Sequence, residues 1–237
     1  MCHQLSKHLL FILFCLGLGL GAQADDRLAP GLAALERNQP KTAARSWRLL
    51  ADQGVPEAQN ALALLYQQGS GVPQDYDEAI RLLESASAQQ LSIATYNLGL
   101  AYYEGTGVKV DFGKAITLFL EAAEADIAAA QYMLGVVFFL GQGTEVAIDE
   151  SIRWLNLAGR QNYPEAQLML AQLFLTVASG DVRLVDAHVW GTIAFANGME
   201  QALDVTNYTQ AALNKKQTAQ AEAIIGECRE DISSCNS

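Results

Sequence analysis

Apolar and small residues recur along this chain at a fixed spacing of 36 positions. Within each period they follow one another at intervals of three and four, which is the spacing of one face of an α-helix. Segments 56–91 and 92–127 are identical at 12 of 36 aligned positions, far more than unrelated sequences share. A period of roughly 20–50 residues indicates a solenoid, in which one small helical or strand unit stacks on the next.

Each period predicts two helices joined by a tight turn. The first helix places Ala94, Leu98 and Tyr102 on one stripe, and a small residue beside the leucine lets a neighbouring helix approach. Glycine accepts the positive φ that ends a helix and reverses the chain. The predicted turns carry such glycines in pairs: Gly69 and Gly71, Gly105 and Gly107, Gly141 and Gly143.

The second helix of each period is expected to begin at an aspartate. Asp75 and Asp111 are placed to cap it, and Asp75 with Glu78 has the spacing of a capping box. Ala147 stands at this position in the third period. We therefore expect Thr144 or Asp149 to cap that helix instead.

These recurring residues resemble the Sel1-like repeat, a relative of the tetratricopeptide repeat. The best copy matches the family pattern at Ala94, Leu98, Gly99, Tyr102, Gly105, Gly107, Val108, Asp111, Ala115, Leu118, Ala122 and Ala123. The resemblance covers roughly residues 40–198. It implies an all-α fold, a right-handed α-solenoid of stacked antiparallel helix pairs, and usually a protein-binding scaffold.

The pattern predicts four repeats with a cap at each end. The repeats are expected at 56–91, 92–127, 128–163 and 164–199, and the last has Ala178–Asp181 in place of its glycine turn. Residues 25–55 read as an N-terminal segment and half-repeat cap. Residues 200–237 read as a helical cap and tail, with helices near 201–213 and 217–227 and a capping box from Asn214 to Gln217.

Residues 1–24 have the pattern of a secretory signal peptide. Lys7 precedes an apolar run from Leu9 to Leu20, and Ala22-Gln23-Ala24 offers a small-residue cleavage site after Ala24. A membrane anchor is the alternative, but a run of about 12 apolar residues is shorter than the roughly 20 needed to span a bilayer. We therefore expect a periplasmic or secreted protein without stable membrane insertion after cleavage.

The chain is acidic, with a formal net charge of −11. This charge repels phosphate backbones and anionic headgroups, so nucleic acid is not an expected partner. The charge is expected to act as a solvated coat that keeps the protein soluble. A basic patch on a partner is the alternative reading.

Cys228 and Cys235 are the only cysteines outside the signal segment. In an oxidising compartment such a pair suggests a disulfide that closes a short loop. Free or intermolecular thiols are the alternative. A redox catalyst would need a C-x-x-C-like spacing at a helix start, and these cysteines are farther apart, at a helix end.

The sequence offers little for catalysis. His188 is the one histidine outside the signal segment, where nucleophile–base pairs and zinc sites usually need more. Some cysteine-rich Sel1-like proteins are β-lactamase-like, but this chain has no cysteine in its repeats and no S-x-x-K arrangement there. We expect no enzyme activity, no cofactor and no metal, with a β-lactamase-like hydrolase as the remote alternative.

The candidate binding residues are the first-helix positions that lie off the core stripe: Tyr96, Leu100, Tyr103, Tyr132, Val136 and Phe139. In stacked helix pairs the first helices line the inner curve, which could hold a partner protein or peptide on its concave face. The alternative is that these side chains are buried in the core between neighbouring repeats. An envelope polysaccharide scaffold is a further alternative, and it would need Tyr96, Tyr103 and Tyr132 open to solvent.

Overall fold

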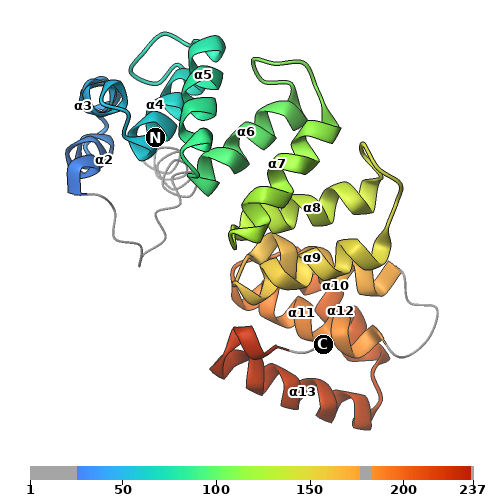
Figure 1. The fold of residues 1–237 in the computed structure, drawn as a ribbon. Helices are drawn as coiled ribbons and strands as arrows, with labels where there is room; N and C mark the ends of the chain where they lie inside the picture. Colours follow the sequence, from blue (N-terminus) through green and yellow to red (C-terminus); the bar gives the residue numbers. More distant parts are fainter. Residues whose placement is uncertain (1–25, 177–182, 236–237) are drawn as a thin grey trace. The chain divides into compact units, whose positions relative to one another are not determined.

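The computed structural model describes residues 26–176 and 183–235, so the predicted signal peptide and the segment Ala178–Asp181 lie outside it. Over the described residues the chain forms 12 α-helices and no strand (Figure 1). These described residues divide into two compact units, with the boundary between Ala125 and Asp126. Within each unit, most helices that follow one another in the chain pack together, in keeping with the solenoid prediction.

The first unit holds six helices around one hydrophobic core. They are α2 (Ala29–Glu36), α3 (Pro40–Asp52), α4 (Pro56–Gln68), α5 (Tyr76–Ala88), α6 (Ser92–Glu104) and α7 (Phe112–Glu124). Helices α2 and α3 lie in the segment that the sequence predicts as a half-repeat cap. Trp47 of α3 is fully buried, and its indole Nε1 donates to the Leu28 carbonyl at 3.3 Å.

The glycine turns behave as the sequence predicts. Gly69 ends α4 in the left-handed conformation, with a φ of 64°, and Gly71 has a φ of 75°. Gly71 also needs to be glycine because it lies against the start of α3. A Cβ at this position would overlap the carbonyl carbon of Pro40 and the amide of Lys41.

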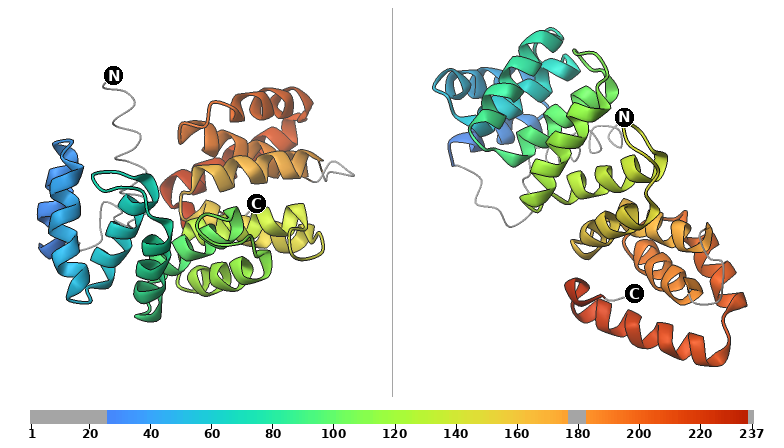
Figure 2. Two further views of the ribbon diagram at one scale, coloured as in Figure 1. Left: turned by 90° about the horizontal axis from the view of Figure 1, so that it is seen from above. Right: turned by 45° about the vertical axis from the view of Figure 1, so that its right-hand side comes forward.

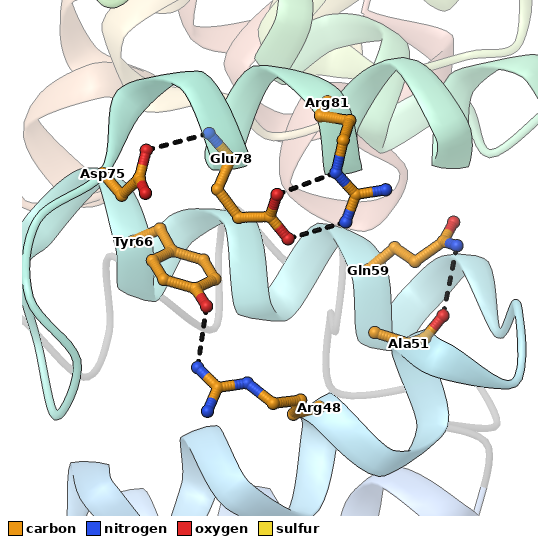
Figure 3. Close-up of polar contacts among 7 residues, drawn as sticks. All are labelled: Arg48, Ala51, Gln59, Tyr66, Asp75, Glu78 and Arg81. Atoms are coloured by element: carbon orange, nitrogen blue, oxygen red, sulfur yellow. Dashed lines mark hydrogen bonds and ion pairs between the residues drawn. The ribbon is translucent and has the colours of Figure 1, made fainter.

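The predicted aspartate caps are present at the starts of α5 and α7, but the capping box expected at Asp75 is not. Asp75 Oδ1 accepts from the Glu78 amide at 3.0 Å, and Asp111 does the same for Lys114 at 2.9 Å. The capping box at Asp75 does not form (Figure 3), because Glu78 instead forms an ion pair with Arg81 at 2.6 Å. The Asp75 amide donates to the Tyr66 carbonyl at 3.1 Å.

The predicted cap for the second helix of the third repeat is wrong. Neither Thr144 nor Asp149 caps α9 (Ile148–Arg160), whose N-cap is Ala147 without a side-chain hydrogen bond. The Ala147 amide donates to the Phe138 carbonyl at 2.9 Å, as the amides of Asp75 and Asp111 do in their repeats. This backbone bond fixes the helix start, so the side-chain cap is dispensable.

Buried glutamines join some of the first helices to their neighbours on both sides, as at Gln59 of α4. Gln59 Nε2 donates to the Ala51 carbonyl at 3.3 Å (Figure 3), and Gln59 Oε1 accepts from Gln89 at 2.9 Å. In the second unit Gln167 binds the Gly159 carbonyl and the Asn197 amide at 2.9 and 2.8 Å. Such a polar group is buried without penalty because both ends of its amide are satisfied.

The second unit contains the remaining six helices. They are α8 (Ala128–Leu140), α9, α10 (Pro164–Thr176), α11 (Leu184–Ala196), α12 (Ala202–Ala212) and α13 (Lys215–Glu230). Gly135 of α8 confirms the expected role of a small residue beside the leucine. A Cβ there would lie 2.5 Å from Cγ of Leu155, so glycine permits the close approach of α9.

The last long helix begins with the predicted capping box. The Asn214 side chain and the Gln217 side chain make the reciprocal hydrogen bonds of a capping box at the start of α13. Helix α13, coloured red in Figure 2, packs on α11 and buries Ala221 and Ile225. Among the described helices, none combines the length and the apolar character that a membrane crossing requires.

Candidate functional site: an apolar groove between α8 and α10

The candidate residues of the first unit lie mainly in the packing between α6 and α7. Tyr96 is only 6% exposed, and its ring lies 6.0 Å from the ring of Phe119. Tyr103 is half-buried, with its ring 5.5 Å from Phe112 in an edge-on arrangement. Leu100 is half-buried as well. A place in the packing between helices therefore describes Tyr96 better than a place in a binding surface, because its side chain is buried.

The candidate residues of the second unit lie on α8 and are more open. Phe139 is 37% exposed, while Tyr132 and Val136 are half-buried. The Tyr132 ring lies 5.3 Å from the ring of Tyr163, which precedes α10. Tyr132 and Phe139 are seven residues apart, so they lie on one side of α8.

That side of α8 borders an open groove of about 580 Å³ within the second unit. The groove lies between α8 and α10, with one residue contributed from beyond α11. Its lining residues are Tyr132, Phe139, Glu165, Leu168, Met169, Gln172, Leu173, Thr176 and Met199. Of the predicted binding residues, Tyr132 and Phe139 therefore share one site, whereas Val136 does not line it.

The groove is suited to hold apolar side chains. Two aromatic residues, two leucines and two methionines make up six of its nine lining residues. Methionine adapts its shape to irregular apolar surfaces. Glu165 is its single charged lining residue, on the first turn of α10. An apolar hollow with a few polar groups at its edge is the usual form of a peptide or small-molecule site.

Sequence reasoning missed part of this site. Leu168 could be expected from its first-helix position, but Met169 was not distinguished from core residues. Met199 follows α11, outside the two helices that form the groove. Nothing in the 36-residue period predicts that Met199 lies beside α10.

His188 has a packing role. It is buried on α11, and its Nδ1 lies 2.8 Å from the hydroxyl of Thr209 on α12. Burial lowers the pKa of this imidazole, so the neutral form that suits a core position is favoured. Among the described residues, no group of three or more His, Cys, Asp or Glu is placed to hold a metal ion.

The two cysteines form the expected disulfide. Cys228, at the end of α13, is bonded to Cys235, which follows the short helix η3 (Ile232–Ser234). Both cysteines are buried in the core of the second unit. Because the sulfur atoms are covered, the bond serves as a staple of the C-terminal cap, and the free-thiol alternative does not describe this structure.

Comparison with known proteins identifies the repeats. The Sel1 repeat family model matches residues 56–91, 92–127 and 128–163. These three consecutive segments are therefore Sel1 repeats. The fourth repeat, at 164–199, lies outside the match and stays a prediction, although α10 and α11 form a packed helix pair there.

Solved structures agree with this assignment. A protective antigen of uropathogenic Escherichia coli strains, which displays an SLR fold, is 29% identical with a TM-score of 0.73. The alignment covers 82% of this chain and 42% of the antigen, so this chain spans less than half of it. A Sel1 repeat protein from Oxalobacter formigenes, 24% identical over 85% of this chain and 86% of its own, shares the fold with a TM-score of 0.70. No curated protein matches the chain.

Proposed function

We propose that this protein is a non-catalytic interaction scaffold that binds an apolar segment of a partner protein or peptide in the α8–α10 groove. The observation that carries the proposal is the groove itself. Two first helices, α8 and α10, leave Phe139, Met169 and Leu168 around an open apolar hollow. Buried aromatic and aliphatic anchors supply most of the binding energy in such interfaces.

The chemistry of the groove also limits its occupant. A segment with two or three large apolar side chains would fill the hollow between Tyr132 and Met199. A lysine or arginine beside them would reach Glu165 at the edge. The net charge of −11 favours such a basic flank over an acidic one.

The aromatic residues support a peptide more than an envelope polysaccharide. Sugar rings need exposed aromatic faces, but Tyr96 is buried and the rings of Tyr103 and Tyr132 pack on Phe112 and Tyr163. Of the three tyrosines on which the polysaccharide alternative depends, one is therefore buried and the other two are only partly open to solvent. We therefore favour the peptide.

The proposal places the protein in the periplasm or outside the cell. Residues 1–24 carry the signal-peptide pattern, with cleavage expected after Ala24. The Cys228–Cys235 disulfide supports this location, because such bonds persist in oxidising compartments.

A peptide selected from a random displayed library against the purified protein tests the groove. Phe139→Ala should raise the Kd of the selected peptide about ten-fold or more, because a large anchor contact is lost. Leu157→Ala is the matched control, since Leu157 is similarly exposed at 39% but lies on α9 outside the groove. Fluorescence anisotropy measures both affinities.

Two outcomes would contradict the proposal. One is a library that yields no binding peptide. The other is equal affinity of the peptide for the Phe139→Ala and Leu157→Ala variants, provided that both retain the helical circular dichroism of the parent.

A further inference from the structure

Positive charge in this acidic protein is concentrated at the N-terminal cap. Residues 26–55 contain five Lys or Arg against three Asp or Glu, whereas residues 56–237 contain nine against 22. The cap is therefore net basic and the rest strongly acidic. This asymmetry is not needed for stacking, because the cap packs through Ala43, Ala44 and Trp47.

Three of these basic residues share one exposed side of α3. Lys41, Arg45 and Arg48 follow at intervals of four and three, which places their side chains in a row. They line a hollow of about 310 Å³ together with Leu49 and the turn residues Gly71 and Val72. All of these residues belong to the first unit.

The basic row of Lys41, Arg45 and Arg48 is held in position, but acidic side chains do not neutralise its charge. Arg48 Nη2 donates to the Tyr66 hydroxyl at 2.7 Å (Figure 3), which fixes the position of its guanidinium. The nearby Glu78 already has a bidentate partner in Arg81. Within the described part of the chain, the side chains of Lys41 and Arg45 form neither ion pair nor hydrogen bond. Asp52 is the one acidic residue that lines the hollow.

We propose that this basic row binds an acidic, carboxylate-rich segment of a partner protein, at a site distinct from the apolar groove. The spacing fits an extended peptide. Residues four apart on a helix are about 6 Å apart along its axis, close to the ~6.7 Å between alternate side chains of an extended strand. Carboxylates on alternate residues of the partner would therefore meet Lys41 and Arg45 in turn.

The apolar part of the hollow favours a peptide over other anions. Leu49 is 63% exposed beside the basic row, and Val72 borders the same hollow. A peptide can cover these side chains with its own aliphatic atoms, whereas a phosphate backbone or a lipid headgroup cannot. The acidic remainder of the chain does not cancel a local contact, because charges are screened beyond about 10 Å at 0.1 M salt.

A fluorescein-labelled peptide of six glutamates tests the proposal with the full chain. The expected result is salt-sensitive binding that the double variant Lys41→Gln/Arg45→Gln weakens about ten-fold. The matched control is Lys215→Gln/Lys216→Gln, which removes two exposed charges from α13 and should change the Kd less than two-fold. All four positions are exposed, so both variants should keep the parent's thermal unfolding midpoint.

Several results would overturn the proposal. The glutamate peptide could fail to bind, or both double variants could weaken it equally. Tighter binding to phosphatidylglycerol vesicles or to an oligonucleotide would assign the row to another class of partner. Binding of a labelled second copy of this chain in preference to the peptide would make the row a self-association surface. None of these outcomes bears on the α8–α10 groove, which is probed with a different ligand.

Discussion

Replacing Gly71 with alanine should lower the free energy of unfolding by about 3 kcal/mol. Two costs combine at this position. An alanine with a φ of 75° is strained by about 1–2 kcal/mol relative to glycine. In addition, its Cβ would overlap the backbone of Pro40 and Lys41, and backbone atoms cannot move aside as the end of a flexible side chain can.

Gly54→Ala separates these two costs. Gly54 has a φ of 84°, but no atom lies within 4 Å of a Cβ built there. This variant should therefore lose only the conformational part, about 1 kcal/mol. Urea unfolding followed by circular dichroism measures both variants. Equal losses would show that the turn at Gly71 does not pack on α3 as described.

Trp190→Ala should cost about 4 kcal/mol, the typical loss for a fully buried tryptophan. Trp190 lies on α11 in the core of the second unit, with no exposed surface. Its ring packs against Gly159, where a Cβ would come within 3.1 Å of it. The cavity left by alanine spans the contact between α9 and α11, so the surrounding helices cannot close it easily.

Trp190→Phe and Phe195→Ala are the controls for this variant. Among the residues that the structure describes, the Trp190 indole Nε1 has no hydrogen-bond partner, so phenylalanine loses no polar contact there and should cost only about 1 kcal/mol. Phe195, on the same helix, is 45% exposed, and its truncation should cost less than about 1 kcal/mol. A Trp190→Ala loss no larger than that of Phe195→Ala would contradict the described core.

The 36-residue period predicts the helix pairs. The ends of the helices could be predicted as well, because they depend on residues close in sequence. Gly69 and Asp75 act within one turn of the chain, and their conformations follow from residue type. The cap at Ala147 was mispredicted because the backbone bond to Phe138 spans nine residues and has no side-chain signature. The glutamines do carry a signature, since Gln59, Gln131 and Gln167 occupy the same position of the 36-residue period, which is interrupted only by Thr95.

The groove was only partly predictable, because exposure depends on what packs beyond each helix. Tyr96 and Tyr132 occupy the same position of consecutive repeats, yet Tyr96 is buried and Tyr132 borders the groove. A periodic pattern assigns both to one face and cannot distinguish them. Met199 shows the same limit, since its place in the groove depends on the chain beyond α11.

Methionine-methyl NMR of the protein with the selected peptide tests the central claim most directly. Met169 and Met199 line the α8–α10 groove, whereas Met133 is on α8 but outside the lining, so it is an internal control. Binding in the groove predicts that the methyl signals of Met169 and Met199 shift on saturation while that of Met133 stays in place. If a saturating peptide leaves Met169 and Met199 unchanged, or shifts Met133 as much, the peptide binds elsewhere and the groove is not the docking site.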